Sequence, residues 1–362
     1  MGERASPLRD AHIELGAKLT EFAGWDMPLQ YSGIVAEHNA VRTTAGLFDV
    51  SHLGKLVVSG AGGGEALGEA VAASVAELEP GRARYGIVLA EDGGCVDDLF
   101  VYRLGADEWL VVPNAANVAA VRDALEASGA SVKDRWDRWA ILALQGPESF
   151  EVIERAWPGT GAPELKLHRF GPLEEVSAGS FVARTGYTGE LGFELYVDAD
   201  QARSAWDRLL EAGAAPVGLG ARDTLRLEMG YALYGHELSR SINPLEAGLG
   251  WALAWEGLWR GRAALERVRE EGPRRELFGI VCRERGVPRR GHQVHASGGL
   301  AGEVTSGNYS PTLGTGIALA LGPRASAPGL GEQVFVEARG RRIEGAIVQP
   351  PFVERGRARS NK

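Results

Sequence analysis

The segment DDLFVYRLGADEWLVVPN, residues 97–114, contains two apolar runs on either side of a short turn. The turn is Gly105-Ala-Asp107, and the flanking runs are rich in Leu, Val and aromatic residues. Such runs joined by a glycine-containing turn are typical of a β-hairpin. We therefore expect an antiparallel hairpin that brings Asp97, Asp98 and Asn114 close together at one end.

Strand and helix patterns alternate around this hairpin. Helical spacing of apolar residues occurs over residues 34–47, 65–78, 115–128, 147–157, 200–210 and 222–229. Asp200 is the expected N-cap of one of these helices. Strand patterns occur over residues 55–58, 139–144, 181–185 and 192–197. Because the two kinds of element are mixed along the chain, the sequence predicts an α+β region.

The chain changes character after residues 272–275, a charged, turn-rich segment that we interpret as a linker. Short strand patterns follow at close spacing, over residues 277–281, 302–305, 316–321, 333–337 and 342–348. No convincing helical pattern lies between them, which predicts a small closed or nearly closed β-barrel. We therefore expect a larger α+β domain over residues 1–271 and an all-β domain over residues 276–355.

Composition and charge exclude several classes of protein. The chain has 362 residues, a net charge of -9 and no apolar run near the roughly 18 residues that a membrane span needs. The negative charge argues against nucleic acid as the main partner. Cys95 and Cys282 lie too far apart for a disulfide framework or a metal clip, so we expect buried, reduced thiols. The polar N-terminal segment leads us to expect a cytoplasmic protein without membrane association.

Common catalytic motifs are absent from the sequence. It contains no GxSxG, P-loop or HExxH pattern, and its seven histidines are scattered, so no metal site is expected. Gly60-Ala-Gly-Gly-Gly64 follows a predicted strand, but Glu65 takes the place of the third glycine of a dinucleotide-binding motif. We interpret that segment as a turn.

Three glycine-containing segments contain polar residues that could bind a ligand or act in catalysis. They are Gly93 to Asp98, Gly186 to Glu194, and Gly220 to Glu228. Glycine lets the backbone approach a ligand closely, and each segment contains carboxylates or arginines. A structural explanation stands beside the functional one in each case: an acidic turn, an ordinary hairpin loop and a solvated helix face. Local pattern alone leaves these alternatives open.

Longer motifs make the chain similar to a known family. They are FAGWDMPLQY at residues 22–31, FDVSHLG at 48–54, GGCVDD at 93–98, RTGYTGE at 184–190, GARDTLRLE at 220–228, LYGH at 233–236, PLEAG at 244–248 and VTSG at 304–307. In this order and spacing the motifs resemble those of glycine cleavage T-proteins, from about Leu8 to Phe352. The resemblance implies a cloverleaf of three domains around a central folate channel, with two intertwined α+β subdomains in residues 1–271 and a small C-terminal all-β barrel.

The resemblance also implies roles for individual residues. Asp98 matches the family's catalytic carboxylate, and the folate-binding positions match Asp98, Val112, Asn114, Tyr187, Glu194, Arg222 and Arg290. A carboxylate such as Glu194 can accept two N–H bonds from the pterin edge of a folate. The planar guanidinium of Arg222 or Arg290 can pair with the carboxylate of the glutamate tail.

The implied reaction is aminomethyl transfer. An aminomethyltransferase of the glycine cleavage system takes the methylene carbon from an aminomethyl-lipoyl carrier protein, the H-protein, releases ammonia and passes the carbon to tetrahydrofolate. Tetrahydrofolate is then the one-carbon acceptor, the lipoylated carrier is the partner, and a monomer or weak dimer is expected. A carboxylate such as Asp98 near the reacting atoms would stabilise the positive charge that develops during transfer.

The chain departs from the family pattern at Leu53, where methionine is usual, and at Pro113, which precedes Asn114. Leucine conserves the side-chain volume, whereas proline removes a backbone donor at a strand end. His52 and His236 lie inside family motifs, and both a structural and a catalytic role stay open for each of them.

Two rival functions share the family fold. A tetrahydrofolate-dependent demethylase would use the same pocket with a methylated small molecule as the donor. A non-enzymatic folate-binding relative, associated with iron–sulfur protein maintenance, carries a cysteine in its KGCYxGQE-like segment. The matching loop here, Gly186-Tyr-Thr-Gly-Glu190, has no cysteine, which favours the enzyme.

Overall fold

The computed structural model describes residues 4–338, 340–354 and 357–358. Residues 1–3 of the predicted larger domain and residues 339 and 355 of the predicted barrel domain lie outside these ranges. The chain divides into two compact units. The first consists of Met1–Val88, Val96–Arg222 and Ala254–Arg260, and the second of Leu89–Cys95, Asp223–Leu253 and Gly261–Lys362. The domain boundary between residues 271 and 276 stays a prediction.

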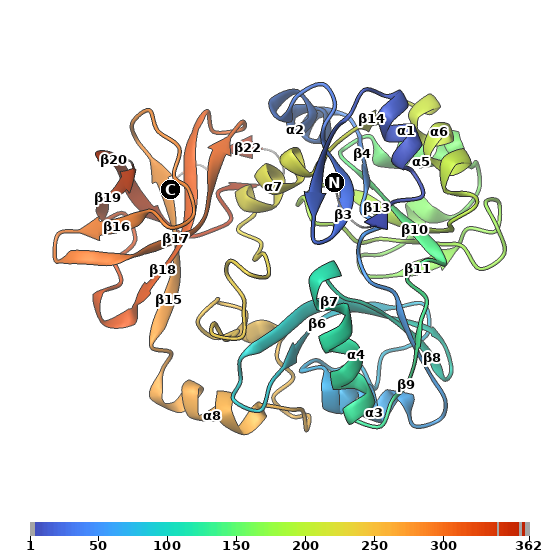
Figure 1. Cartoon of the computed structure of the whole chain (residues 1–362), viewed down its shortest axis with the longest axis horizontal. Helices are drawn as coiled ribbons and strands as arrows, with labels where there is room; N and C mark the ends of the chain where they lie inside the picture. The colour runs from blue at the N-terminus through green and yellow to red at the C-terminus, as the bar shows by residue number, and fades with distance from the viewer. Residues whose placement is uncertain (1–3, 339, 355–356, 359–362) are drawn as a thin grey trace. The chain divides into compact units, whose positions relative to one another are not determined.

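One sheet of the first unit has the strand order β11-β12-β13-β10-β4-β14 (Figure 1). Its strands are β4 (Gly46–Asp49), β10 (Trp139–Gln145), β11 (Phe170–Pro172), β12 (Phe181–Ala183), β13 (Gly192–Asp198) and β14 (Ala215–Pro216). Helices α1 (Arg9–Glu14), α5 (Ser149–Ala156) and α6 (Ala202–Glu211) contribute to the core that covers it. Leu142, Leu144 and Trp206 are buried in this core, which holds β12 and β13 in place.

A second sheet of the first unit, with the order β6-β7-β8-β5-β9, contains the predicted hairpin. Its strands are β5 (Leu56–Ser59), β6 (Ala83–Leu89), β7 (Cys95–Gly105), β8 (Glu108–Val112) and β9 (Ser131–Asp134). β7 and β8 pair antiparallel with Phe100 opposite Val112, which confirms the hairpin. Helices α3 (Gly63–Ala70) and α4 (Val118–Ala127) lie together beside this sheet (Figure 1).

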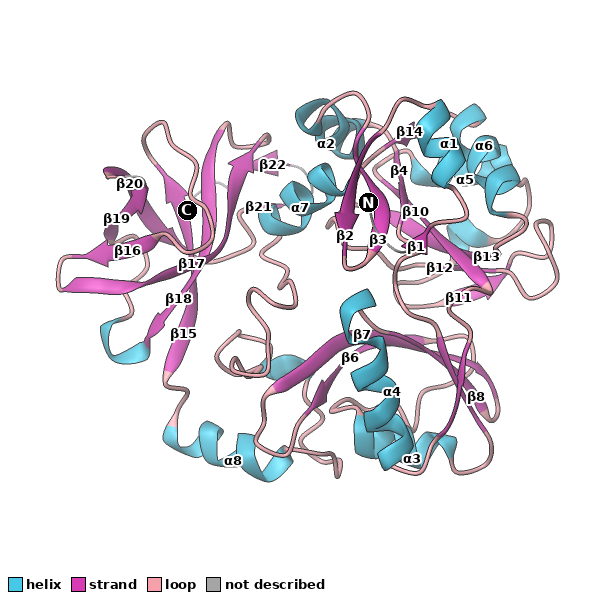
Figure 2. Cartoon of the chain, in the orientation of Figure 1, coloured by secondary structure: helices cyan, strands magenta, loops and turns pink. Residues whose placement is uncertain are grey.

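A third, smaller sheet of the first unit lies near the N-terminal end of the chain. It has the order β1-β3-β2 and consists of β1 (Arg4–Ala5), β2 (Lys18–Phe22) and β3 (Trp25–Gln30). Helix α2 (Ile34–Thr43) follows it directly in the sequence. The mixture of strands and helices in Figure 2 confirms the predicted α+β class.

The second unit contains a closed β-barrel with the strand order β15-β18-β17-β16-β19-β20. Its strands are β15 (Arg275–Cys282), β16 (Gln293–Ala296), β17 (Gly299–Ser310), β18 (Thr315–Pro323), β19 (Gln333–Ala338) and β20 (Arg341–Val348). Ile280 and Ala318 pair across two strands inside the barrel core. Ile317 and Leu319 alternate with Ala318 and pack outside, with Leu227 of α7 (Leu219–Glu228). The predicted barrel is therefore confirmed.

Short elements complete the second unit. Helix α8 (Arg262–Glu271) precedes the barrel, and strands β21 (Val353–Glu354) and β22 (Arg357–Ala358) follow it. Among the described residues no helix has the length and apolar character that crossing a membrane requires. The arrangement of three domains around a channel stays a prediction.

The structure corrects several predicted element boundaries. The helix predicted over residues 34–47 ends at Thr43, because Gly46–Asp49 forms the buried strand β4. The helix predicted over residues 65–78 ends at Ala70, and the next residue, Val71, bridges to the strand β6. Short apolar runs fit a buried strand as well as a helix, so periodicity does not separate the two.

Two smaller predictions are also corrected. Asp200 is not a helix cap, since α6 begins at Ala202 after Gln201 and no side chain caps it. The sequence pattern does not predict β16, because Val294 is the one fully buried residue in that strand. A strand with so little apolar character is defined by its pairing with β17 and β19.

Candidate active site

The end of the β7–β8 hairpin brings together the polar residues that flank it. Asn114 Nδ2 donates to Asp97 Oδ1 at 2.8 Å and to Asp98 Oδ1 at 3.2 Å. The backbone N–H of Asn114 donates to Asp97 Oδ2 at 2.9 Å. Asn117 Nδ2 donates to Asp97 Oδ1 at 2.6 Å. Asp97, Asp98 and Asn114 therefore form one hydrogen-bonded group, as the hairpin predicts.

The neighbouring residues Asp97 and Asp98 differ in environment, because successive side chains of a strand point to opposite faces. Asp97 is buried, whereas Asp98 is partly exposed. Burial and the negative charge of Asp98 raise the pKa of Asp97 to about 8, and hydrogen bonds from Asn114 and Asn117 oppose part of that rise. Asp98 is therefore the carboxylate of the pair that is open to a ligand.

Tyr85 on β6 belongs to the site, although no sequence motif marks it. Its hydroxyl group donates to Asp98 Oδ2 at 3.0 Å. The contact arises because β6 and β7 are neighbours in the sheet. Only the pairing of these strands identifies Tyr85 as a partner of Asp98.

Glu194 on β13 provides a second buried carboxylate. Two hydroxyl groups donate to its Oε2: Thr185 Oγ1, and Tyr102 OH at 3.4 Å. Within the described part of the chain Oε1 has no hydrogen-bond partner. Thr185 and Tyr102 thus hold Glu194 in place and leave one of its oxygens able to accept.

An aromatic row connects the two carboxylates. Asp98, Phe100 and Tyr102 occupy alternate positions of β7, so their side chains share one face of the strand. The ring centroid of Phe100 lies 5.9 Å from that of Tyr85 and 6.1 Å from that of Tyr102. Asp98 and Glu194 therefore lie at opposite ends of the same row, which we call the aromatic row.

The loop between β12 and β13 is held in place by Gln145. Gln145 Nε2 donates to the carbonyl oxygens of Thr185 and Phe193, and its Oε1 accepts from Thr188 Oγ1 at 2.8 Å. Gly186 lies against this side chain, and an added Cβ would lie 2.1 Å from Gln145 Oε1. Close packing on Gln145 is thus a physical reason for the glycine in this motif.

Tyr187 and Arg222, both predicted binding residues, lie together. The Arg222 guanidinium carbon is 4.7 Å from the centroid of the Tyr187 ring, a cation–π contact. Burial, followed by the positive charge of Arg222, lowers the pKa of His52 to about 3. His52 is therefore neutral at physiological pH, and its ring packs edge to face on Phe22 at 5.4 Å. These contacts favour the structural role for His52.

Val112 and Arg290 complete the predicted set. Val112 is buried and lies opposite Phe100 in the hairpin. Arg290 belongs to the second unit, where its guanidinium donates to the carbonyl oxygen of Gly235 at 2.6 Å. The structure thus groups Asp98 with Asn114, and Tyr187 with Arg222, and the role of Arg290 stays a prediction.

The other candidate residues have structural surroundings. His236 Nδ1 lies 3.1 Å from Ser306 Oγ, and burial lowers the pKa of His236. Cys95 and Cys282 are buried free thiols, as predicted. Across residues 4–338, 340–354 and 357–358, no three His, Cys, Asp or Glu side chains are grouped so as to hold a metal ion.

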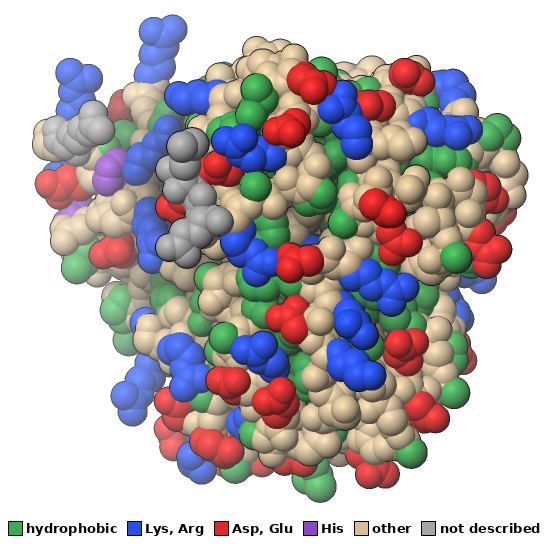
Figure 3. Space-filling model, turned by 45° about the vertical axis from the view of Figure 1, so that its right-hand side comes forward, with side chains coloured by type: hydrophobic (Ala, Val, Ile, Leu, Met, Phe, Trp, Pro, Cys, Tyr) green, Lys and Arg blue, Asp and Glu red, His purple; other side chains and the backbone are tan. Residues whose placement is uncertain are grey.

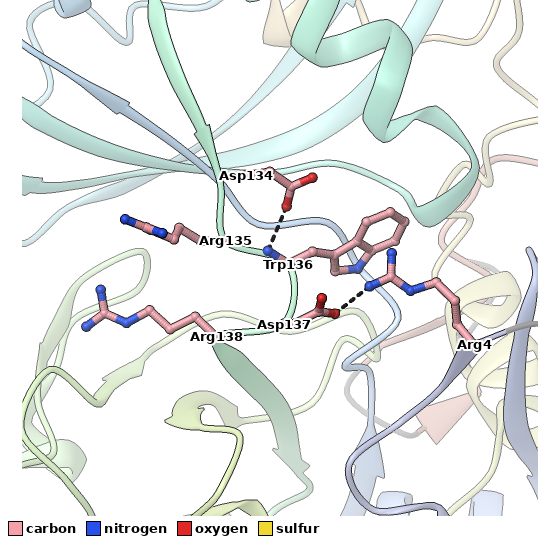
Figure 4. A pocket seen from close by; sticks show the side chains of 6 residues that line it. All are labelled: Arg4, Asp134, Arg135, Trp136, Asp137 and Arg138. Carbon is pink, nitrogen blue, oxygen red and sulfur yellow. Dashed lines mark hydrogen bonds and ion pairs between the residues drawn. The ribbon is translucent and has the colours of Figure 1, made fainter.

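A surface pocket of about 310 Å³ lies elsewhere in the first unit, at the connection between β9 and β10 (Figure 4). It is lined by Arg4, Asp134, Arg135, Trp136, Asp137 and Arg138. Arg4 forms an ion pair with Asp137 and lies over the Trp136 ring. Since none of the lining residues belongs to the carboxylate site, we do not assign the reaction to this pocket.

Comparisons with known proteins identify the relatives of this fold. The GCVT N-terminal domain matches residues 8–257, and the glycine cleavage T-protein C-terminal barrel domain matches residues 275–354. The aminomethyltransferase of Halothermothrix orenii is 43% identical over 97% of this chain and 100% of its own length. That of Geobacillus kaustophilus is 46% identical over 98% of this chain and 100% of its own length.

A solved structure agrees with these matches. The crystal structure of glycine cleavage system aminomethyltransferase T from Bartonella henselae is 34% identical in sequence and has a TM-score of 0.91. The match covers 98% of this chain and 99% of that one. Fold and relatives together define a one-carbon transferase. The chain belongs to the glycine cleavage T-protein family, the aminomethyltransferases of the glycine cleavage system, which confirms the resemblance of its motifs.

Proposed function

We propose that the chain passes the methylene carbon of an aminomethyl-lipoyl carrier protein to tetrahydrofolate, with release of ammonia. The observation that carries the proposal is the pair of carboxylates, Asp98 and Glu194, at the ends of one aromatic row in a chain of the T-protein family. A demethylase would use the same residues with another donor. The identity of the donor is therefore the point that the experiment has to decide.

Tetrahydrofolate fits the chemistry of these side chains. Its pterin ring has adjacent N–H donors, and the Oε1 atom of Glu194 is able to accept. Bonds from such donors to a carboxylate are charge-assisted, and burial of Glu194 strengthens them. The aromatic row offers flat apolar surface to a conjugated ring. We therefore assign Glu194 to recognition of the pterin.

Asp98 is the proposed catalytic residue. Tyr85 and Asn114 donate to different oxygens of its carboxylate, so its orientation is set before a substrate binds. A fixed negative charge stabilises positive charge on the carbon under transfer and needs no reorganisation during the reaction. When bound, the folate supplies the nitrogen that takes the carbon. Asp98 thus acts by electrostatic stabilisation.

The other predicted residues would bind the rest of the folate. Arg222 would pair with the carboxylate of the glutamate tail, and its contact with Tyr187 would restrict its motion. Arg290 would supply a second guanidinium for the same purpose. Val112 would provide an apolar wall, and Asn114 a polar contact beside Asp98.

The proposed partner is the lipoylated H-protein, with no nucleic acid or membrane involved. On the face drawn in Figure 3, acidic and basic side chains are interspersed and do not form one extended basic surface. A protein partner agrees better with such a surface than a nucleic acid does. We further propose a cytoplasmic enzyme that is a monomer or weak dimer, and light scattering of the purified chain tests that state.

The decisive experiment combines the purified chain with tetrahydrofolate and an aminomethyl-loaded lipoyl carrier protein. Ammonia and methylene-tetrahydrofolate are followed together. We expect both products from the wild-type chain and about a 100-fold loss of turnover in Asp98→Asn, with folate binding kept, since a lost electrostatic contact to a transition state costs that much. Asp92→Asn, the same change at an exposed site in the preceding turn, is the control and should leave turnover unchanged.

Each alternative outcome has a clear meaning. Near-normal turnover in Asp98→Asn would refute the catalytic assignment. Folate binding without either product would refute the lipoyl donor and point to a methylated small molecule instead. Failure of the wild-type chain to bind tetrahydrofolate would refute tetrahydrofolate as the one-carbon acceptor.

A further inference from the structure

Asp97 is a buried carboxyl group to which the proposed function gives no role. Its side chain is 0% exposed. It accepts from the backbone N–H and the Nδ2 of Asn114, at 2.9 and 2.8 Å, and from Asn117 Nδ2 at 2.6 Å. Because Asp97 is closed off from solvent, it cannot contact a substrate, and the groups that it binds are the route by which it would position one.

Asn114 is the group that connects Asp97 with Asp98. Asn114 Nδ2 lies 2.8 Å from Asp97 Oδ1, 3.2 Å from Asp98 Oδ1 and 3.1 Å from the Asp98 carbonyl oxygen. All three neighbours are acceptors, so turning the amide over would place its oxygen against oxygens. The contacts of Nδ2 therefore determine which way the amide faces.

The opposite end of the same amide group is open. Within the described residues Asn114 Oδ1 has no hydrogen-bond partner, and Asn114 is partly exposed. An amide held by its nitrogen thus presents its oxygen as an acceptor beside Asp98. A substrate that carries an N–H or O–H group next to the reacting carbon would meet this acceptor.

We propose that Asp97 is a positioning residue for aminomethyl transfer: it holds the Asn114 amide so that Nδ2 supports Asp98 and Oδ1 faces a donor group of the substrate. This inference rests on the proposed function, since it assigns Asp97 to the same reaction. A carboxyl group suits the task because its two oxygens together accept the three N–H groups around it. In Asp97→Asn the side chain offers one oxygen and an NH₂ group, and the NH₂ group would face N–H donors of Asn114 or Asn117 from which it cannot accept.

The charges around Asp97 agree with this role. Asp98 is the ionisable group that faces Asp97, and the remaining neighbours are the amides of Asn114 and Asn117. Burial and the charge of Asp98 raise the pKa of Asp97 to about 8. Burial and the charge of Asp98 thus oppose ionisation of Asp97, whereas the hydrogen bonds from Asn114 and Asn117 favour it.

The test is a double-mutant cycle in the ammonia-release assay, with kcat and KM measured separately. We expect Asp97→Asn to lower kcat by about 10- to 100-fold, since misplacing a group by about 1 Å can cost 100-fold, and to leave KM for the carrier unchanged. Asn114→Ala should lower kcat similarly. The double variant should be no slower than Asn114→Ala alone, because Asp97 acts through Asn114. Asp92→Asn again serves as the matched control, and its kcat and KM should equal those of the wild type.

Losses that multiply in the double variant would overturn the inference. Normal kcat in Asn114→Ala would do so as well, and this variant decides the matter even where Asp97→Asn does not fold. A further check exchanges the pair, with Asp97→Asn and Asn114→Asp combined. This exchange keeps one carboxyl–amide contact in the hairpin but places no donor against Asp98. We therefore expect the exchanged variant to fold and to turn over slowly. Restored turnover would contradict the proposal.

The outcomes also separate this inference from the proposed function. A wild-type chain that releases no ammonia refutes the proposed function. A wild-type chain that is active, is inactivated by Asp98→Asn and is unaffected by Asp97→Asn refutes only the positioning role of Asp97.

Discussion

At the residue scale, the site depends on how buried side chains share their hydrogen bonds. Thr185 and Tyr102 use one oxygen of Glu194, and the other oxygen stays open. Glu194 is 8% exposed, so a ligand can reach this open oxygen. A ligand that brings N–H donors would meet a charged acceptor there, which is the reason for the proposed binding position.

Glu194→Gln should weaken tetrahydrofolate binding by about 10- to 100-fold, the equivalent of ~1.5–3 kcal/mol for bonds to a charged acceptor. The amide of the variant still accepts from Thr185, so the thermal unfolding midpoint should change little. Fluorescence or calorimetric titration with tetrahydrofolate measures the effect. Glu211→Gln, an exposed site at the end of α6, is the control. Unchanged affinity in Glu194→Gln would remove Glu194 from the pterin site.

The raised pKa of Asp97 predicts how stability depends on pH. Its folded-state pKa of about 8 lies above the unfolded value of 3.8, so the folded chain binds the proton more tightly. The stabilisation from this group is complete below about pH 3.8 and is lost as the pH rises through 8. The difference in unfolding free energy between wild type and Asp97→Asn should therefore shrink from pH 5 to pH 8.5. Urea unfolding at both pH values measures it, and a difference that grows contradicts the direction of the shift.

At the scale of elements, two β-hairpin ends carry the site. The β7–β8 hairpin carries Asp98, and its strand end tolerates Pro113 because the carbonyl of Pro113 accepts from Gly54 while Asn114 N–H still reaches Asp97. The β12–β13 loop is anchored by Gln145. Both ends are rigid because buried side chains hold the backbone.

Gly186→Ala should destabilise the protein by about 1–3 kcal/mol, because its Cβ would overlap Gln145, a buried side chain fixed by its own hydrogen bonds. Folate affinity should fall as well, since Thr185 and Tyr187 belong to the same loop. Urea denaturation gives the free energy of unfolding. The control is Gly62→Ala, where an added Cβ meets nothing within 4 Å. Equal stability of the two variants would show that the loop adjusts without cost.

At the scale of the whole molecule, helix α7 passes from the first unit into the second. Its last residue, Glu228, is buried and accepts from Ser310 Oγ at 2.5 Å and from Thr312 N and Oγ1 at 3.1 and 2.9 Å. The backbone N–H of Phe352 donates to the Glu228 carbonyl oxygen. One buried carboxylate thus joins the helix end to the barrel within the second unit.

Glu228→Gln should lower the stability of the second unit by about 1.5–3 kcal/mol, because an amide cannot accept all of these hydrogen bonds. Hydrogen exchange should become faster in β17 and β18, whereas exchange in β6, β7 and β8 should not change. Exposed Glu270→Gln in α8 is the matched control. Faster exchange throughout both units would show that the effect is not local to the barrel.

Much of the fold follows from the sequence alone. The hairpin at residues 97–114, the barrel strands other than β16 and the α+β class are each encoded by periodicity and turn residues within a short stretch. The family follows from the order of long motifs. Where an apolar run fits two elements, as at Gly46–Asp49, local pattern does not choose, and packing between β10 and β14 makes it a strand.

For the candidate site as well, some features follow from the sequence and others only from the tertiary structure. The motifs single out Asp98, Glu194 and Asn114, because these residues lie in glycine-rich stretches or beside the hairpin. The partners of those residues come from elsewhere in the chain: Tyr85 for Asp98 and Tyr102 for Glu194. Strand pairing and burial bring these partners to the carboxylates, and the spacing of residues within a motif predicts neither. For the same reason the sequence by itself singled out the candidate carboxylates Asp98 and Glu194, and only the tertiary structure decided their hydrogen bonds and their exposure.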